Sequence, residues 1–280
     1  MAASEPIDLF HTGAARTVGA YLLDTSEGLA LFDCGPATCV PALKTGLAER
    51  GYELGDVRHL LLSHIHLDHA GAAGTLVREH PRLQVWVSEI GAPHLVDPSR
   101  LERSARRLYG DTFDELWGEL APVPEENVRI ASERAAGLEV FPAPGHASHH
   151  VVYFDGSTVY AGDAAGVRIQ PSTSVLPPTP PPDVDVEGWY RTLEHIERLA
   201  PERLALIHFG IAEDVGRHLG ELRGRIDTWA RRVQEGASEE EFVAAAKSDL
   251  SPAEAEEYDR AMPFWQSYAG LARYWETQRS

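Results

Sequence analysis

The chain has 280 residues, of which 43% are hydrophobic and 24% charged, a composition typical of a globular protein and not of a disordered or fibrous one. Its 43 acidic and 25 basic residues give a net charge of -18, which disfavours binding to the negative backbone of nucleic acid. The sequence has no apolar run near the roughly 20 residues of a membrane span. It also lacks a secretory signal and has only two cysteines, so we expect a cytoplasmic protein without membrane contact.

Up to residue 210, short apolar runs alternate with stretches of helical spacing, which predicts an α/β fold. The expected strands lie at residues 21–23, 29–32, 60–63, 85–88, 138–141, 151–154, 158–161 and 204–208. Helices are expected at residues 36–50, 70–80 and 186–199.

Two segments of this core, which we place at residues 1–210, need a separate interpretation. Residues 99–120 predict an amphipathic helical insertion that either packs on the core or forms a wall over a pocket. Residues 171–183 are proline-rich and predict a semi-rigid surface loop. After the core, residues 211–280 predict an extension of three helices, whose apolar faces pack on the core or on a second copy in a homodimer.

Histidines cluster in two short groups, HIHLDH at residues 64–69 and HASHH at residues 146–150. A loop that leaves a strand can turn His64 and His66 toward one point, while the next turn carries Asp68 and His69 toward a neighbouring point. Imidazole and carboxylate groups suit zinc, iron or manganese. Four such side chains within six residues therefore predict a site for two metal ions.

Three further candidate ligands, His146, Asp163 and His208, each follow an apolar run. A glycine stands next to His146 and Asp163 and close to His208, and glycine permits a close backbone approach at a strand end. The roles of His149 and His150 stay open between structural support of the ligands and transfer of a proton.

The motifs HIHLDH, PGHASHH, AGDAAG and HFG, in this order, resemble the metallo-β-lactamase superfamily and, within it, the glyoxalase II-like hydrolases. The resemblance covers about residues 7–210 and implies an αββα sandwich of two mixed sheets flanked by helices, with a metal site at one edge. It implies that His64, His66 and His146 bind a first metal ion and that Asp68, His69 and His208 bind a second. Asp163 would bridge the two ions, and Asp33 would support the ligands from behind. The basic residues that bind glutathione in glyoxalase II have no counterpart here, so the resemblance assigns no substrate.

From these residues we expect a hydrolase with two divalent metal ions. Zn²⁺ is the expected metal, and iron and manganese are the alternatives. A metal-bridging hydroxide would attack an activated carbonyl of a small-molecule thioester, lactone or ester, with Asp163 holding the ions and Asp68 steering the proton. One alternative is an oxygenase that resembles persulfide dioxygenases and uses one iron. Another is cleavage of a small phosphodiester. A purely structural metal site is disfavoured because it normally needs only four ligands.

Overall fold

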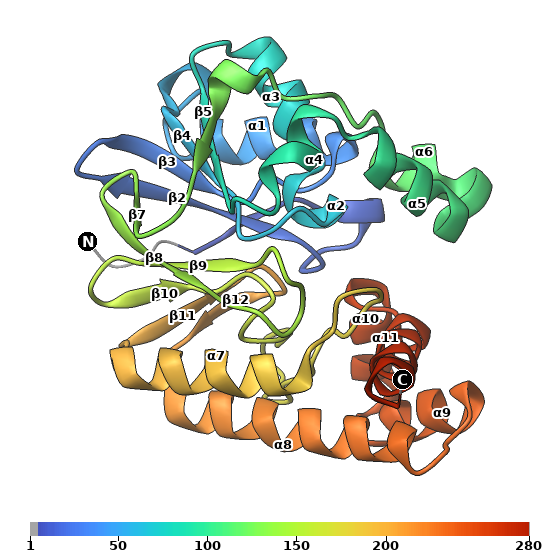
Figure 1. Cartoon of the computed structure of the whole chain (residues 1–280). Helices are drawn as coiled ribbons and strands as arrows, with labels where there is room; N and C mark the ends of the chain where they lie inside the picture. Colours follow the sequence, from blue (N-terminus) through green and yellow to red (C-terminus); the bar gives the residue numbers. More distant parts are fainter. Residues whose placement is uncertain (1–4, 280) are drawn as a thin grey trace.

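The computed structural model describes residues 5–279, which form two six-stranded sheets packed face to face (Figure 1). The first sheet contains, in spatial order, β1 (Ile7–Asp8), β2 (Gly19–Thr25), β3 (Gly28–Phe32), β4 (His59–Leu61), β5 (Gln84–Val87) and β6 (Val128–Ile130). The second contains, in spatial order, β12 (Gly210–Ala212), β11 (Arg203–Leu206), β10 (Thr158–Tyr160), β9 (Val151–Phe154), β8 (Leu138–Pro142) and β7 (Arg134–Ala135). Both sheets mix parallel and antiparallel pairs.

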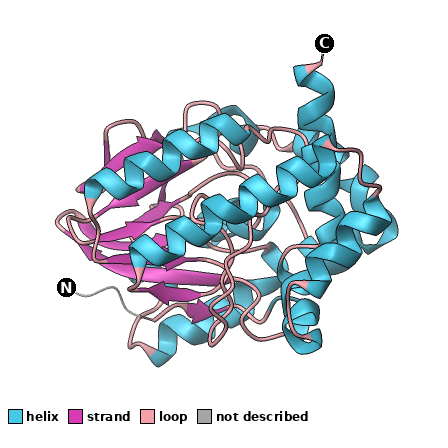
Figure 2. Cartoon of the chain, turned by 90° about the horizontal axis from the view of Figure 1, so that it is seen from below, coloured by secondary structure: helices cyan, strands magenta, loops and turns pink. Residues whose placement is uncertain are grey.

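Helices cover the outer face of each sheet, as the αββα prediction requires. The helices are α1 (Val40–Glu49), α2 (Leu67–Ala70), α3 (Ala73–Glu79), α4 (Ala92–Val96), α5 (Ser99–Tyr109), α6 (Phe113–Trp117), α7 (Val186–Leu199), α8 (Val215–Gln234), α9 (Glu239–Ser248), α10 (Pro252–Ala261) and α11 (Phe264–Gln278). The long helices α7 and α8 run side by side across the second sheet (Figure 2). The predicted fold class is therefore confirmed.

Aromatic side chains fill the space between the sheets. Tyr21 and Phe32 of the first sheet meet Tyr153 and Tyr160 of the second, with ring centroids 5.6 to 6.1 Å apart across the interface. Two of their hydroxyls also cross the interface, because Tyr153 donates to the carbonyl of Leu62 at 2.9 Å and Tyr21 donates to that of Leu206 at 2.8 Å. These contacts fix the ends of β4 and β11, after which His64 and His208 follow in the chain.

The insertion predicted at residues 99–120 forms two helices, α5 and α6, separated by Gly110 at a φ of 55°. The surface position predicted for residues 171–183 is wrong for its central part: Val175 and Leu176 are fully buried and join the hydrophobic core of the second sheet. Apolar side chains inside a proline-rich segment explain the difference, since burying them is favourable whatever the backbone conformation.

The end of the chain contains four helices rather than the predicted three, because Pro263 separates α10 from α11. Their buried side chains join the same core as β9 to β11, so a separate unit at residues 211–280 stays a prediction. Among the described residues, no helix is both long and apolar enough to cross a membrane.

Candidate metal centre

The fold brings the seven predicted ligands together at one edge of the sandwich, although they come from four separate segments. His64 and His66 follow β4, and Asp68 and His69 lie on the single-turn helix α2. The other three, His146, Asp163 and His208, follow β8, β10 and β11. Ligand atoms within 4.8 Å of one another form three overlapping groups: His64, His66 and His146; His64, His69 and Asp163; Asp68, His69 and His208.

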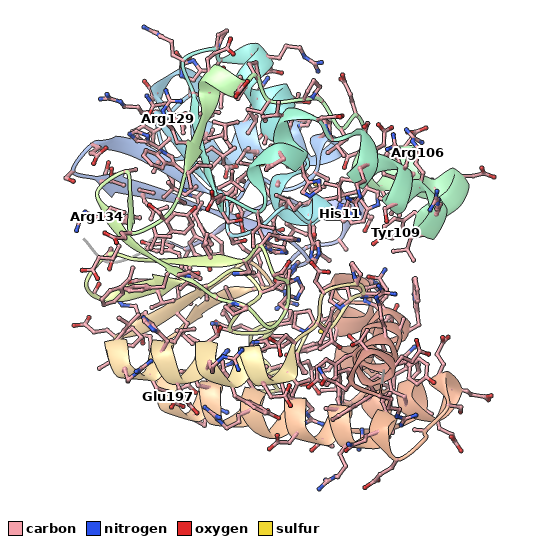
Figure 3. The ribbon with its side chains drawn as sticks, in the orientation of Figure 1. His11, Arg106, Tyr109, Arg129, Arg134 and Glu197 are labelled. Atoms are coloured by element: carbon pink, nitrogen blue, oxygen red, sulfur yellow. The ribbon has the colours of Figure 1, made fainter. Side chains whose placement is uncertain are left out.

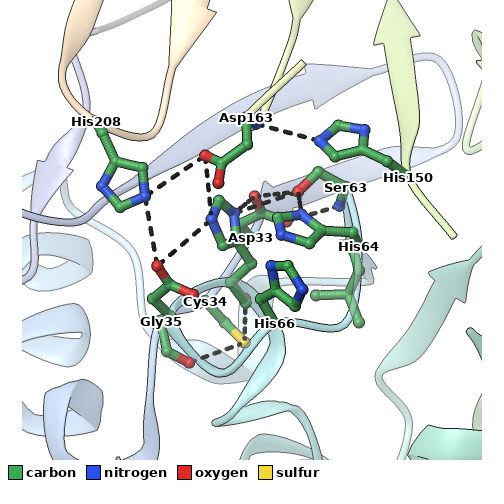
Figure 4. A network of polar contacts seen from close by, with 12 residues as sticks. Asp33, Cys34, Gly35, Ser63, His64, His66, His150, Asp163 and His208 are labelled. Carbon is green, nitrogen blue, oxygen red and sulfur yellow. Dashed lines mark hydrogen bonds and ion pairs between the residues drawn. The ribbon is translucent and has the colours of Figure 1, made fainter. Parts of the chain in front are cut away.

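Asp163 lies between the two predicted sets of ligands (Figure 4). Its Oδ2 is 3.3 Å from His146 Nε2 in the first set. Its Oδ1 is 3.4 Å from His69 Nε2 and 3.5 Å from His208 Nε2 in the second set. One carboxylate oxygen therefore faces each set, which is the arrangement expected of a bridging ligand.

The nitrogen–oxygen spacing in the group fits metal coordination better than hydrogen bonding, whereas His146 Nε2 lies at hydrogen-bond distance, 2.9 Å, from His66 Nδ1. Ligands about 2.0 to 2.2 Å from a tetrahedral ion lie about 3.3 to 3.6 Å from one another. The nitrogen–oxygen distances at Asp163 are 3.3 to 3.5 Å, and His208 Nε2 lies 3.5 Å from Asp68 Oδ2. Three buried atoms of the group, His64 Nε2, His69 Nε2 and Asp163 Oδ1, have no hydrogen-bond partner. Unpaired buried polar atoms are costly, so the residues present fit a bound cation.

Hydrogen bonds from Nδ1 hold three of the histidine rings so that their Nε2 atoms face the centre of the group. His69 Nδ1 donates to Asp33 Oδ2 at 2.7 Å, His146 Nδ1 donates to the Pro178 carbonyl at 2.7 Å, and His208 Nδ1 donates to the Thr17 carbonyl. Because Nδ1 carries the proton in each case, Nε2 is left with a lone pair for a metal ion.

Asp33 organises the HIHLDH segment from a fully buried position. It accepts hydrogen bonds from the backbone N–H and the hydroxyl of Ser63, both at 2.7 Å. Since the Ser63 proton goes to Asp33, the Ser63 oxygen accepts from His64 Nδ1 at 2.9 Å, which frees His64 Nε2. The resemblance suggested Asp33, and the residue pattern alone gave no signal for it.

The protonation states of His64, His66 and Asp163 suit metal binding. At His69 and His208, burial would lower the pKa, but the nearby carboxylates of Asp163 and Asp68 outweigh burial and raise it. Burial lowers the pKa of His64 well below its ordinary value, and burial together with nearby His146 lowers the pKa of His66 to about 3. Burial would raise the pKa of Asp163, but the imidazoles of His69 and His146 outweigh it and hold that pKa well below its usual range. Neutral imidazoles and an ionised carboxylate are the forms that coordinate metals.

His150 and His149 have different surroundings. His150 Nε2 accepts a hydrogen bond from the backbone N–H of Asp163 at 3.2 Å, and its ring stacks on His64 with centroids 4.7 Å apart. Gly162 makes this approach possible, because a Cβ there would lie 2.8 Å from His150 Nε2 and its φ is 50°. His149 instead lines the pocket beside the ligands.

A pocket of about 730 Å³ opens from the ligand group and is lined by residues of α5, of α6 and of the junction between α10 and α11. His11 and Tyr109 line it, and Figure 3 labels both residues on the side of α5 and α6. His11 is 8% exposed and stacks on Trp117, and the Tyr109 hydroxyl lies 3.2 Å from Gln266 Nε2 across the pocket. No motif surrounds His11 in the sequence, so the sequence carries no signal for its place in the pocket.

Comparison with known proteins identifies a family model and two relatives that are similar to this chain. The model of the metallo-beta-lactamase superfamily matches residues 15–208. ST1585 of Sulfurisphaera tokodaii, named as a metallo-beta-lactamase fold-containing protein, is 26% identical over 56% of this chain and 62% of its own length. YobT of Bacillus subtilis, named as uncharacterized, is 26% identical over 54% of this chain and 63% of its own length. The chain thus matches less than two thirds of the length of these two relatives.

Solved structures show the same fold over a longer span. The ST1585 structure has a TM-score of 0.67 with 18% identity, and the match covers 96% of this chain and 95% of that one. TTHA1623, whose structure was solved in a di-iron-bound form, has a TM-score of 0.55 with 26% identity, over 73% of this chain and 91% of that one. Since the family model matches well over half of the 280 residues, the chain belongs to the metallo-beta-lactamase superfamily.

Proposed function

We propose that the protein is a hydrolase with a dinuclear metal centre that acts on an activated carbonyl group of a small molecule. Membership of the metallo-beta-lactamase superfamily indicates metal-dependent hydrolase activity. The observation that carries the finer proposal is the convergence of seven histidine and aspartate side chains, three of whose buried atoms have no hydrogen-bond partner.

The residues would divide between two ions. His64, His66 and His146 would hold one ion, while Asp68, His69 and His208 would hold the other. Asp163 would contribute one oxygen to each ion, since its two oxygens face different sets. Bound divalent ions supply Lewis-acid charge and lower the pKa of water to about 7.

The chain's own groups set the positions of the reacting atoms. The buried Nδ1 contacts of His69, His146 and His208 keep the ligand nitrogens in place, so little reorganisation is needed during the reaction. Asp68 directs Oδ2 toward His69 and His208, at 3.8 and 3.5 Å, which leaves Oδ1 to accept a proton from the attacking water. Its side chain is 23% exposed and lines the pocket, so a substrate can reach it.

The same protonation states bear on the leaving group. Both carboxylates, Asp68 and Asp163, have lowered pKa values because neighbouring histidines outweigh the effect of burial. Histidines that bind a metal ion do so in their neutral form. The proton that Asp68 accepts from water is therefore the one that these seven residues would have available for a leaving group. A thioester, lactone or activated ester fits this group better than an amide, and a glyoxalase II-like thioesterase is one form of the proposal.

The metal could be zinc or iron. Three histidines and a carboxylate suit either ion, and the similar protein TTHA1623 was solved with two irons. Elemental analysis of the purified protein should therefore accompany the activity assays.

The test is metal analysis combined with a panel of thioester, lactone, ester, β-lactam and phosphodiester reporters. We expect two divalent ions per chain, with turnover of a carbonyl substrate and no oxygen consumption. One iron per chain with thiol-dependent oxygen uptake would contradict the proposal in favour of an oxygenase. Turnover of the phosphodiester alone would contradict it in favour of a phosphodiesterase.

A further inference from the structure

The pocket that leads to the ligand group carries the opposite charge to the chain as a whole. The chain has 43 acidic and 25 basic residues. Four arginines line the pocket, two on each wall: Arg100 and Arg107 on α5, and Arg260 and Arg273 on α10 and α11. Apart from the ligands Asp68 and Asp163, the only carboxylate lining it among the described residues is Asp183, which accepts a hydrogen bond from Ser148.

The α5 wall has two stripes of different character. Arg100, Ser104 and Arg107 follow one another at four- and three-residue steps and share one side of the helix, so the two arginines lie about 10 Å apart along its axis. Beside them, Leu101, Ala105 and Leu108 form an apolar stripe with the same spacing. All six residues line the pocket.

The two α5 arginines also differ from their neighbour Arg106 in their partners. Arg106 forms ion pairs with Glu102 and Asp114, both at 2.8 Å. Within residues 5–279, no ion pair or hydrogen bond involves the side chain of Arg100 or Arg107. A guanidinium without a carboxylate partner, placed on a pocket wall, is available to bind an oxyanion of a ligand.

On the opposite wall the arginines are partly engaged. Arg260 pairs with Glu256 at 2.5 Å, and Arg273 donates from Nε to the Pro182 carbonyl at 3.3 Å. Arg273 therefore keeps its full positive charge at the pocket, whereas the charge of Arg260 is balanced locally.

We propose that the substrate carries an oxyanion, either a carboxylate or a phosphate, at the end remote from the reacting carbonyl. This inference rests on the proposed function. Arg100 and Arg107 bind this group, and Arg273 adds positive charge from the facing wall. The segment that joins the oxyanion to the carbonyl is apolar and packs on Leu101 and Leu108. This assigns an amphipathic, anionic substrate class to the pocket.

The test compares three p-nitrophenyl esters of equal acyl length with the metal-loaded enzyme: one ending in a carboxylate, one in a phosphate and one in a methyl group. We expect kcat/KM to be at least tenfold higher for one or both anionic esters, and the preference to shrink as NaCl increases. The double variant Arg100→Glu, Arg107→Glu should remove the preference through KM. The matched control Arg103→Glu, on the same helix but outside the pocket lining, should keep it. Equal use of all three esters by the wild type would overturn the inference.

A binding measurement separates this inference from the proposed function. If none of the esters is hydrolysed, the hydrolase proposal fails for esters, while calorimetric titration with adipate still tests the arginines. Adipate should bind the wild type and the Arg103→Glu variant with equal affinity, and the double variant at least tenfold more weakly. Equal affinity for all three proteins would overturn the inference independently of turnover.

Discussion

The ligand group lies within the main body of the protein, whereas α5 and α6 pack around a small separate cluster of Leu67, Ala105 and Phe113. Five of the seven ligands are at most 3% exposed, and protein atoms hold the rings of His69, His146 and His208 from behind. The pocket face of α5 instead carries exposed arginines, and Ala105 is the one buried residue that this helix has. The difference predicts that the core sets the positions of the proposed metal ligands, and that α5 influences which substrate is bound.

The largest effect should come from removing a ligand. His66→Ala or Asp163→Asn should lose stoichiometric metal and lower kcat/KM at least about a thousandfold, because the metal supplies several kcal/mol of transition-state stabilisation. Metal analysis and turnover of the same preparations provide the measurement. His195→Ala on α7, outside the ligand group, is the control and should retain both. Full activity in either ligand variant would show that the site assignment is wrong.

A smaller loss should follow from changing the support behind a ligand. Asp33→Asn removes a charged partner of His69 and Ser63, so we expect metal affinity to fall about 10- to 100-fold. Competition with a chromogenic chelator measures this. Asp24→Asn changes an exposed carboxylate on β2 and should leave the affinity unchanged. If both variants bind metal equally well, the buried network does not hold the site.

The contact between the sheets should affect stability. Tyr153→Phe leaves the Leu62 carbonyl without its hydrogen bond, which should lower the free energy of unfolding by about 1 to 3 kcal/mol. Urea unfolding measures the change. Tyr52→Phe, at a half-buried position outside the interface, should cost much less. Equal stabilities for the two variants would mean that the cross-sheet hydrogen bond contributes nothing.

The pocket wall should influence substrate binding more than the chemical step. Tyr109→Phe removes the hydroxyl that meets Gln266, so KM should rise about twofold to tenfold with little change in kcat. Steady-state kinetics on the reporter with the highest turnover measures both constants. A loss of kcat as large as that of the ligand variants would remove the distinction between the two regions.

The smallest expected effect is the change with pH in the stability that Asp214 contributes. Burial would raise the pKa of Asp214, but the guanidinium groups of Arg168 and Arg217 outweigh burial and lower it to about 2. A carboxyl group whose pKa falls on folding stabilises the protein above its unfolded value of 3.8 and loses that contribution as the pH drops toward 2. The stability difference between wild type and Asp214→Asn should therefore be smaller at pH 3 than at pH 6 in urea unfolding. A larger difference at pH 3 would contradict the sign of this shift.

Local sequence patterns predicted much of the fold. The helix expected at residues 186–199 is α7, because its apolar side chains recur at helical spacing over its whole length. Short strands were missed, among them β6, β7 and β12, since two or three residues carry no measurable alternation and form strands only by pairing with a neighbour.

The candidate site also has one part that the sequence predicted and one part that it did not. The ligand residues occur in short motifs that are visible in one sequence, and their assignment to metal stays a prediction. His11, Tyr109 and Arg107 stand in no motif and reach the pocket only because distant segments fold against one another. The amphipathic pattern of residues 99–120 predicts either packing on the core or a pocket wall, and it does not determine which side chains of α5 face the pocket.

The central claim is that two metal ions share Asp163. Anomalous diffraction from crystals of the metal-loaded protein, collected at the absorption edge of the bound metal, tests it most directly. The account predicts two peaks, one among His64, His66 and His146 and one among Asp68, His69 and His208, both within coordination distance of Asp163. A single peak, or peaks away from Asp163, would contradict it.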